Sequence, residues 1–399
     1  MCCIIIPYMA RNITTGIDIG TYQVKVVVAE HIRGKDRRFP KIIGTGFAES
    51  KGLRHGYIIN SGDVIKSIRS AVIQAEKAAG TKIKRAFISI GGVGLDEIRS
   101  KADVIISRAD SEITDLDVQN VLSKSEENIQ SKIVNRKVLH VVPLRYKVDG
   151  SEILGARPVG LKGSKLEVET LFITCFEQHL NDLIQTVEEN GIEVEDVMAS
   201  PLAGSLVTLT KTQKIAGCVL TNIGAETVSI VVFEDNIPIS LKVFPIGSTD
   251  ITHDIALGLK ISIEDAERIK LGSAEDPALS KKQLDDIVVS RIRDIFDLIE
   301  AHLKRIGKNG LLPAGIIMTG GGSGVATIED LARASLKLPS KIGDVHTTEH
   351  SRSPIRDSTW AVAYGLCIWG FTANDEPLGI KLARQTGGSL VSWVRQFLP

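Results

Sequence analysis

The sequence predicts an α/β fold that contains an internal duplication and a smaller α+β insertion. Strands are followed by helices along the first part of the chain, which is the element order of an α/β protein. Both halves also begin in the same way, with a strand, a glycine turn and a second strand, at residues 15–30 and 214–239. The two segments share little sequence identity, but this repeated order is typical of a duplicated unit.

In the first half, the hydrophobic pattern predicts three strands, one helix and a fourth strand. Residues 15–30 form apolar runs around a Gly-Thr turn and indicate a hairpin, and residues 42–48 indicate a further strand. Over residues 63–79 the apolar positions recur with a helical period, and Gly80 follows as a C-cap. Residues 86–90 indicate a short buried strand that ends in two glycines.

Between residues 91 and 172 the pattern changes to that of a small α+β insertion. Strands are expected at residues 104–107, 138–146 and 166–174. A helix begins after Thr114, with Asp117 three residues later as in a capping box. Pro143 and Pro158 mark irregular or edge positions, because proline cannot donate a ladder hydrogen bond.

The second half resumes the alternation of strands and helices. Helices are predicted at residues 178–190, 249–259, 262–271 and 284–306. The last of these carries one long apolar stripe and is therefore amphipathic. A buried strand over residues 314–324 runs into four glycines within five positions, and Thr327 caps a helix that ends at Leu336.

Composition excludes several classes of protein. The 399 residues carry 48 Lys+Arg against 48 Asp+Glu, and this zero net charge argues against bulk nucleic-acid binding. A hydrophobic content of 43% is enough for a sizeable core, yet no uncharged apolar run reaches the roughly 18 residues of a membrane-spanning helix. The five cysteines are scattered and odd in number, which favours reduced thiols over a disulfide framework.

Three glycine turns are candidate phosphate-binding sites. They lie at residues 18–21, 222–225 and 320–324, each at the end of a predicted strand. Glycine permits close backbone approach to a ligand, and backbone N–H groups with a hydroxyl such as Thr21 can bind phosphate oxygens. A single glycine turn is usually only a turn, but three in this order favour a phosphate ligand.

These turns resemble the phosphate 1, phosphate 2 and adenosine motifs of the actin/Hsp70/hexokinase ATPases. The segments KVLHVVP at 137–143, PVGLKG at 158–163, DIA at 254–256 and DAERIK at 265–270 narrow the resemblance to FtsA, the bacterial cell-division actin homologue. The resemblance covers nearly the whole chain. It implies an actin-like two-lobed ATPase core that clasps ATP and Mg²⁺, an inserted α+β subdomain and a C-terminal amphipathic helix.

The same resemblance implies how the chain is divided. The expected parts are a first core subdomain (1A) at 13–90 and 173–212, an inserted subdomain (1C) at 91–172, a second core subdomain (2A) at 213–248 and 310–371, subdomain 2B at 249–309, a linker at 372–388 and a membrane-targeting helix at 389–398.

It also implies the nucleotide site, residue by residue. The expected ligands are Asp18, Gly20 and Thr21 at the phosphates, with Asp18 also at the metal, Gly224 and Thr227 in the second phosphate hairpin, Glu267 and Lys270 at the ribose or adenine, and Gly320, Gly321 and Gly322 behind the adenosine. Without the resemblance, Glu267 and Lys270 would be taken for a solvated helix face.

The chain departs from the superfamily pattern at the second motif. Asn222 stands where an aspartate is usual, and Ala225 and Glu226 stand where glycines are usual. Asparagine is neutral and cannot supply a carboxylate for Mg²⁺ or its water. Glu226 would bring a negative charge near the phosphates unless it points away. We therefore expect nucleotide binding with at most a weak ATPase.

The C-terminal segment predicts a membrane-surface helix. In residues 389–398 the apolar side chains fall within one arc of roughly 160° on a helical wheel. They are Leu390, Val391, Trp393, Val394, Phe397 and Leu398, and Arg395 lies on the opposite, polar arc. Such a helix can lie in a bilayer interface with its cation toward anionic lipid, although a terminal helix can also pack on its own core.

The resemblance implies a division protein at the cytoplasmic face of the bacterial membrane. It would polymerise head to tail and tether FtsZ filaments to the membrane at the septum, and its insertion would contact other divisome proteins. Arg291, Arg293 and Lys304 lie off the apolar stripe of helix 284–306 and are candidates for binding the FtsZ C-terminal tail.

Two alternatives share the same core. A phosphotransferase such as a sugar kinase needs a catalytic carboxylate aimed at the phosphoryl group, and Asn222 argues against it. A pilus-assembly actin homologue of the PilM type shares the core and the insertion, and the amphipathic C-terminus argues against it.

Overall fold

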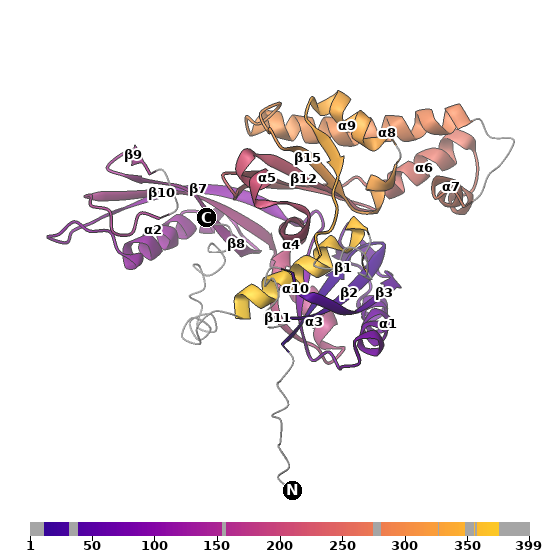
Figure 1. Cartoon of the computed structure of the whole chain (residues 1–399), viewed down its shortest axis with the longest axis horizontal. Coiled ribbons are helices and arrows are strands. Elements are labelled where there is room, and N and C mark those ends of the chain that lie inside the picture. Colours follow the sequence, from indigo (N-terminus) through magenta and orange to yellow (C-terminus); the bar gives the residue numbers. More distant parts are fainter. Residues whose placement is uncertain are drawn as a thin grey trace, which may run out of the picture.

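The computed structural model describes residues 12–374 except 32–38, 154–156, 274–280, 326, 348–354 and 356. These residues form two lobes, each built on a five-stranded sheet, and a third, smaller sheet that extends from one end of the molecule (Figure 1). The predicted linker and terminal helix, over residues 375–399, lie outside the described residues.

The first sheet has the strand order β11-β6-β1-β2-β3. Its strands are β1 (Ile13–Ile19), β2 (Gln23–Glu30), β3 (Lys41–Glu49), β6 (Arg85–Ile90) and β11 (Glu193–Ala199). β1, β2 and β3 are consecutive antiparallel neighbours, whereas β6 pairs in parallel with both β1 and β11. The predicted hairpin and the two further strands are confirmed.

Helices cover both faces of this sheet. They are α1 (Ser61–Ala79), α3 (Glu177–Glu188), α4 (Ser200–Thr208) and α10 (Ala361–Asn374). Alternate residues of β2 point to opposite faces. Val26 and Val28 accordingly belong to the core under α1, whereas Val27 and Ala29 belong to the core under α10. Gly80 ends α1 in the left-handed conformation, as predicted.

The position of α10 corrects the expected division of the chain. Residues up to 371 were assigned to the second core subdomain, but α10 packs on β1, β2, β6 and α4 of the first lobe. A Cβ at Gly16 of β1 would lie only 2.1 Å from the carbonyl oxygen of Ala363, so glycine is required for this close approach. The sequence pattern had indicated neither α4 nor α10, because both are apolar all round and lack an amphipathic period.

The insertion is an antiparallel sheet with the order β7-β10-β8-β9 and one helix across it. Its elements are β7 (Asp96–Ile105), α2 (Asp115–Glu127), the 3-10 turn η1 (Gln130–Lys132), β8 (Arg136–Val148), β9 (Ser151–Glu152) and β10 (Lys165–Phe176). β8 and β10 extend beyond the predicted strands at both ends, whereas β7 covers residues 96–105 rather than the predicted 104–107. The capping box is confirmed, since the Asp117 carboxylate accepts the Thr114 backbone N–H at 2.8 Å. Pro143 lies at a register shift between β8 and β10, so its predicted irregular position is also confirmed.

The second sheet has the order β14-β13-β12-β15-β16. Its strands are β12 (Cys218–Ile223), β13 (Val228–Glu234), β14 (Ile237–Phe244), β15 (Gly315–Thr319) and β16 (Ser340–Ile342), and its helices are α5 (Lys211–Ala216), α6 (Ser248–Leu259), α7 (Ile263–Lys270), α8 (Lys281–Arg305) and α9 (Ile328–Leu336). The apolar stripe of α8 is buried, as predicted. Lys214 lies in α5 rather than in the β segment that was expected to begin there. Thr327 precedes α9, but its side chain makes no capping hydrogen bond.

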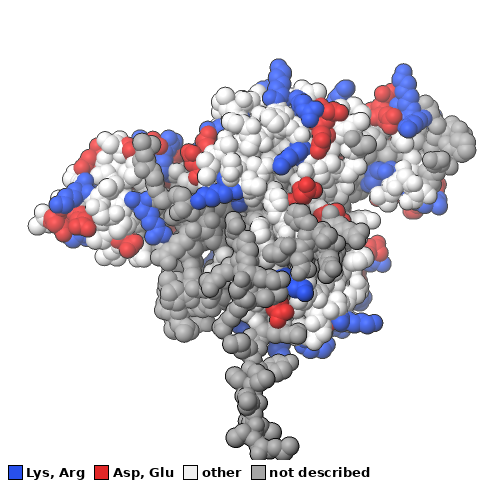
Figure 2. Space-filling view, viewed as in Figure 1, with Lys and Arg blue, Asp and Glu red and all other residues white. Residues whose placement is uncertain are grey.

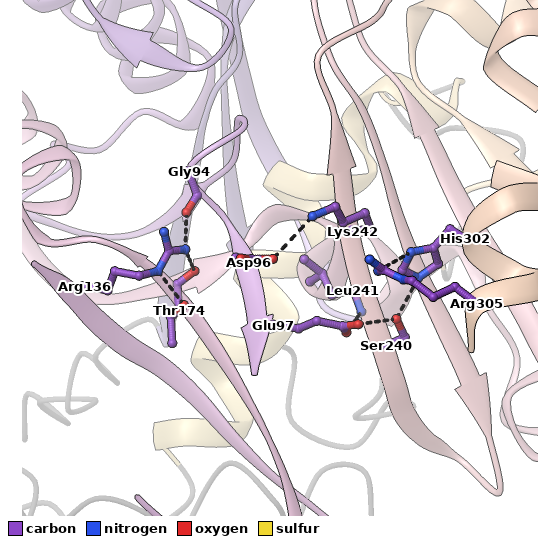
Figure 3. Close-up of polar contacts among 10 residues, drawn as sticks. All are labelled: Gly94, Asp96, Glu97, Arg136, Thr174, Ser240, Leu241, Lys242, His302 and Arg305. Carbon is purple, nitrogen blue, oxygen red and sulfur yellow. Dashed lines mark hydrogen bonds and ion pairs between the residues drawn. The ribbon is translucent and has the colours of Figure 1, made fainter. Parts of the chain in front are cut away.

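The insertion is fixed at its root and docks on the edge of the second sheet (Figure 3). At the root, Arg136 donates hydrogen bonds to the carbonyl of Gly94 and to the side chain of Thr174, so it joins the two chain segments that enter and leave the insertion. At the edge, the Glu97 carboxylate accepts the Ser240 hydroxyl at 2.9 Å and the Leu241 backbone N–H at 2.6 Å.

A second side chain of β7 completes the docking on β14. Arg99 donates to the carbonyl of Ile239 at 2.8 Å. Ile239 and Leu241 are alternate residues of an edge strand, whose outward N–H and C=O groups would otherwise lack a ladder partner. Glu97 and Arg99 therefore cap the edge of the second sheet, and burial raises the pKa of Glu97 above its usual value.

We expect Glu97→Ala to expose this edge. The Leu241 amide loses its acceptor, so its hydrogen exchange should quicken by at least about tenfold, the equivalent of roughly 1.4 kcal/mol of protection. Exchange mass spectrometry over residues 237–244 measures this. The exposed Glu152 of β9 offers a matched control. Equal exchange in wild type, Glu97→Ala and Glu152→Ala would contradict the role given to Glu97.

No helix among the described residues is both long and apolar enough to span a bilayer. On the face shown in Figure 2, charges of both signs are interspersed over both lobes and the insertion.

Candidate functional site

A cavity of about 480 Å³ lies between the two lobes. All ten residues that the sequence predicted for a nucleotide site line it: Asp18, Gly20, Thr21, Gly224, Thr227, Glu267, Lys270, Gly320, Gly321 and Gly322. They come from four separate segments, namely the β1–β2 turn, the β12–β13 turn, α7 and the turn after β15. The fold therefore brings the three glycine turns together around one space.

The β1–β2 hairpin places an acidic and a basic side chain opposite each other at the wall of the cavity. Asp18 and Lys25 are direct cross-strand partners in the hairpin, and both line the cavity. Ser89 of β6 donates its hydroxyl to Asp18 Oδ1 at 2.7 Å. Burial raises the pKa of Asp18, although Lys25 and Ser89 oppose the shift. Burial likewise lowers the pKa of Lys25, against the charges of Asp18 and Asp357.

The second hairpin turn is held on the first turn of α6. Within the hairpin, the Gly224 N–H donates to the carbonyl of Thr227 at 2.9 Å. The backbone N–H groups of Ser248 and Thr249 donate to the carbonyls of Gly224 and Ala225 at 2.9 and 2.8 Å. The hairpin and the start of α6 therefore form one unit on the second-lobe side of the cavity.

The two unusual residues of this hairpin have different positions. Asn222 lines the cavity, so the carboxylate that is usual at this position is absent from the wall. Glu226 does not line the cavity. Its carboxylate instead accepts the backbone N–H of His55 from the first lobe. The negative charge thus points away from the expected phosphate position.

The turn after β15 is shaped by close backbone contacts. Gly320 has a φ of +85°, and a Cβ there would lie 2.3 Å from the Asn222 side-chain oxygen. Gly322 is restricted by packing alone, because its Cβ would meet the Ile223 side chain at 2.4 Å. Only glycine combines this backbone conformation with such close packing, which leaves an open, flat wall for a ligand.

Glu267 and Lys270 form a network with α6. Lys270 Nζ lies 2.7 Å from Glu267 Oε2 and donates to Thr252 Oγ1 at 2.7 Å. Thr252 in turn donates to Glu267 at 2.5 Å. Burial favours the neutral acid, but the hydrogen bonds from Lys270 and Thr252 lower the pKa of Glu267 below its usual value. Both side chains line the cavity at its α7 side.

Sequence reasoning missed several residues of the cavity, including Lys25, Ser89, His179 and Thr319. The signal for Lys25 was present, because the register of the β1–β2 hairpin places it opposite Asp18. Thr319 directly precedes the predicted glycine turn at 320–324, so its position was also indicated. Ser89 and His179 reach the cavity only through the tertiary fold, and the sequence around them does not indicate a ligand site.

The chemistry of the lining residues favours binding over covalent catalysis. Of the two carboxylates, Asp18 faces Lys25, and Glu267 is paired with Lys270. Among the described residues, no group of three His, Cys, Asp or Glu side chains is arranged to hold a metal ion. Mg²⁺ bound with a nucleotide typically takes only one or two protein carboxylates besides phosphates and water. The single carboxylate of Asp18 therefore fits such an ion.

The residues predicted to bind a partner lie on α8. Arg291 is engaged in a bidentate pair with Asp254 at 2.6 and 2.9 Å. Arg293 and Lys304 are exposed and lie about three helical turns apart, on the same face. Lys304 also pairs with Glu300 at 2.8 Å. The predicted membrane-binding side chains of residues 390–398 fall outside the described residues.

Two family models match the chain. The model described as cell division protein FtsA matches residues 219–365, and the model of the SHS2 domain inserted in FtsA matches residues 95–174. Among curated proteins, cell division protein FtsA of Borreliella burgdorferi is 30% identical over 357 residues, which cover 84% of this chain and 85% of that protein. FtsA of Pseudomonas aeruginosa is 27% identical over 390 residues, covering 92% and 91%.

Solved structures resemble the fold. The PilM–PilN type IV pilus biogenesis complex contains a chain that matches with a TM-score of 0.68 at 16% identity, covering 91% of this chain and 99% of that one. MreB5 of Spiroplasma citri bound to ADP matches with a TM-score of 0.52 at 12% identity, covering 90% and 97%. These neighbours confirm the actin-like fold, and at such identities they show the fold alone.

Proposed function

Because this chain belongs to the FtsA family of cell division proteins, we propose that it binds ATP between its lobes, polymerises as an actin-like filament and tethers FtsZ filaments to the cytoplasmic membrane at the division septum. One observation carries the nucleotide part of this proposal. The ten residues predicted from three separate motifs line a single cavity between the lobes. A structural neighbour of the same fold is bound to ADP.

Each wall of the cavity would bind a different part of the nucleotide. Backbone N–H groups of the two hairpin turns and the Thr21 hydroxyl would donate to phosphate oxygens, and Lys25 would offset their charge. Glu267 and Lys270 would flank the ribose or adenine beside the flat glycine turn of Gly320. Mg²⁺, when bound at Asp18, would offset further phosphate charge. With Asn222 in place of a carboxylate, we propose a nucleotide-dependent switch with at most a weak ATPase.

The proposed partner surfaces are based on the exposed cations of α8 and on the insertion at one end of the molecule. The same-face pair Arg293 and Lys304 would meet the acidic C-terminal tail of FtsZ, whereas Arg291 supports α8 through Asp254. The insertion, which extends from one end (Figure 1), would contact other divisome proteins. Head-to-tail repetition of the two lobes would build the filament, because a heterologous contact of this kind does not close on itself.

The terminal helix at residues 389–398 would attach the filament to anionic lipid. At ten residues it is marginal as an isolated helix in water and would form on the membrane. One helix binds weakly, because interfacial burial of each apolar side chain is partial and contributes only about 1.5 kcal/mol. Polymerisation would array many helices on one surface, and the resulting avidity would stabilise attachment.

We expect Trp393→Glu to release the protein from anionic vesicles and to leave ATP binding intact. The substitution removes the largest apolar side chain of the helix and places a charge in its apolar arc. Co-sedimentation with vesicles, FtsZ and ATP measures the loss, and calorimetry measures ATP affinity. Gln396→Glu is a matched control, because it adds the same charge on the polar arc.

Two outcomes would count against this proposal. If Trp393→Glu still sediments with vesicles, the terminal helix is not the anchor. If it loses ATP binding as well, the helix packs on the protein's own core. FtsZ sedimenting with vesicles equally well when this protein is omitted would refute the tether itself.

A further inference from the structure

Glu226 links the two lobes beside the cavity. It belongs to the β12–β13 hairpin of the second lobe, and its carboxylate accepts the backbone N–H of His55 from the first lobe. The His55 ring returns a contact, with Nδ1 3.2 Å from the Glu226 carbonyl oxygen. Glu226, whose negative charge would be unfavourable near phosphates, is thus part of a polar contact across the cleft.

The first-lobe side of this contact is rigid. His55 lies in the tight turn between β4 (Leu53–Arg54) and β5 (Tyr57–Ile58), with a φ of +48°. Its carbonyl accepts the backbone N–H of Val93, just after β6, at 3.2 Å. Gly56 packs so closely on Gly92 that a Cβ at Gly56 would lie 2.4 Å from the Gly92 Cα. The turn therefore moves with β6, the strand that carries Ser89 and its bond to Asp18.

The second-lobe side is fixed in the same way. The two residues before Glu226 are bound through their carbonyls to the first turn of α6. Gly247, which precedes α6, packs so closely that a Cβ there would lie 2.3 Å from the Ala225 carbonyl oxygen. Neither partner can follow the other if the lobes separate, so the contact between Glu226 and His55 has to break when the cleft opens.

We propose that Glu226 is a positioning residue that clasps the two lobes beside the cavity and slows the release of nucleotide. This rests on the proposed binding of ATP. Glu226 does not line the cavity, so it acts through the position of the hairpin that carries Gly224 and Thr227. The clasp holds the two phosphate turns of opposite lobes at a fixed separation.

Nucleotide release is the sensitive measurement. Because a hydrogen bond to a charged acceptor is stronger than one between neutral groups, losing it should speed release of a fluorescent ATP analogue by at least about tenfold. Glu226→Ala should show the full effect. Glu226→Gln should show a smaller one, because its amide oxygen can still accept the His55 N–H but without charge. Glu127→Ala, which removes an exposed glutamate at the end of α2, should release nucleotide at the wild-type rate.

A second measurement works without nucleotide. Spin labels at Lys77 of α1 and Asp297 of α8, with Cys2 and Cys3 replaced by serine, report the separation of the lobes by electron paramagnetic resonance. Glu226→Ala should lengthen and broaden the distance distribution of the nucleotide-free protein, while its melting temperature stays near that of wild type.

The two measurements separate the failure of each idea. If wild type does not bind the analogue, the proposed ATP binding fails, and the label distances alone decide whether the clasp exists. If Glu226→Ala changes neither release rate nor distance, or if Glu127→Ala speeds release equally, the clasp is refuted.

Discussion

Replacing Lys25 with methionine is expected to weaken ATP binding by roughly a hundredfold and to destabilise the first lobe. Lys25 is a partly buried cation on the first-lobe wall of the cavity, directly across the β1–β2 hairpin from Asp18. Methionine keeps most of the side-chain volume but removes the charge that would face the phosphates. A charge-assisted contact contributes about 1.5–3 kcal/mol, so affinity should fall by roughly a hundredfold.

The loss of stability has a separate cause. Asp18 is partly buried, and its carboxylate would keep the hydrogen bond from the Ser89 hydroxyl but lose the nearby positive charge of Lys25. Removing the compensating charge from a partly buried carboxylate costs about 1–3 kcal/mol, less whatever Asp18 recovers by taking up a proton. Urea unfolding measures this cost. Asp18→Asn combined with Lys25→Met should recover most of the stability, because no unpaired charge remains, but none of the ATP affinity.

This pair of variants distinguishes binding from folding. If Lys25→Met binds ATP with wild-type affinity by calorimetry, Lys25 has no contact with the phosphates. If the double variant regains ATP binding along with stability, the single variant was merely unfolded, and the proposed role of Lys25 is wrong.

Local signals explain why so much of the site was predictable. A strand followed by a glycine turn is marked in the sequence itself, and the three turns at Gly20, Gly224 and Gly320 are the ones that meet in the cavity. The capping pairs that begin α2 and α7 were also predictable from the sequence, because a cap requires a particular side chain at a particular spacing.

The features that the sequence did not predict depend on contacts between residues that are far apart in the chain. α10 carries apolar residues on all sides and returns to the first sheet after the whole second lobe, so neither its helical period nor its destination is visible locally. Glu97 and Arg99 look like ordinary surface charges until the fold places them against the edge of β14. Glu226 looked unfavourable for the same reason, because its partner is the backbone of His55 in the other lobe.

Acid should destabilise the protein before most of its carboxylates titrate, because two histidines are buried in the neutral form. The Nε2 of His140 accepts the backbone N–H of Ala199 at 3.0 Å, and burial lowers the pKa of His140 from 6.5 to about 3. On α8, Arg305 can only donate to Nδ1 of His302, at 2.9 Å, so Nε2 carries the proton that bonds Ser240. Burial, with the charges of Arg305, Lys242 and Arg99, lowers the pKa of His302 to about 4.

The direction of the effect follows from which state binds the proton. Both folded-state pKa values lie below the unfolded value of 6.5, so the unfolded chain binds more protons as acid is added. The stability that these histidines contribute is complete above about pH 6.5 and is lost as the pH falls toward 4 and 3. Each protonation costs up to about 1.4 kcal/mol per pH unit, which is large against a typical total of roughly 5–15 kcal/mol.

Burial also lowers the pKa of His179, so this third histidine acts in the same direction, whereas buried carboxylates act at other pH values or in the opposite direction. Asp117 has a pKa lowered to about 2, so its contribution is lost only below about pH 4. The raised pKa of Glu97 makes the folded state bind the extra proton, which favours folding in acid and partly offsets the histidines. Between pH 6.5 and about 5, the histidines therefore contribute most of the pH dependence of the free energy of unfolding.

Urea unfolding at a series of pH values from 7.5 to 5 tests this expectation. The free energy of unfolding should begin to fall near pH 6.5 and approach a combined slope of roughly 2–3 kcal/mol per pH unit for the two histidines. His140→Gln should remove about half of that slope, because the glutamine oxygen can accept the Ala199 N–H without titrating. The exposed His253 of α6 provides the control, and His253→Gln should leave the slope unchanged. Two results would contradict this expectation. One is a free energy of unfolding of the wild type that stays constant down to pH 5, and the other is the same slope in His140→Gln as in wild type. Either would show that protonation of these imidazoles does not destabilise the folded state.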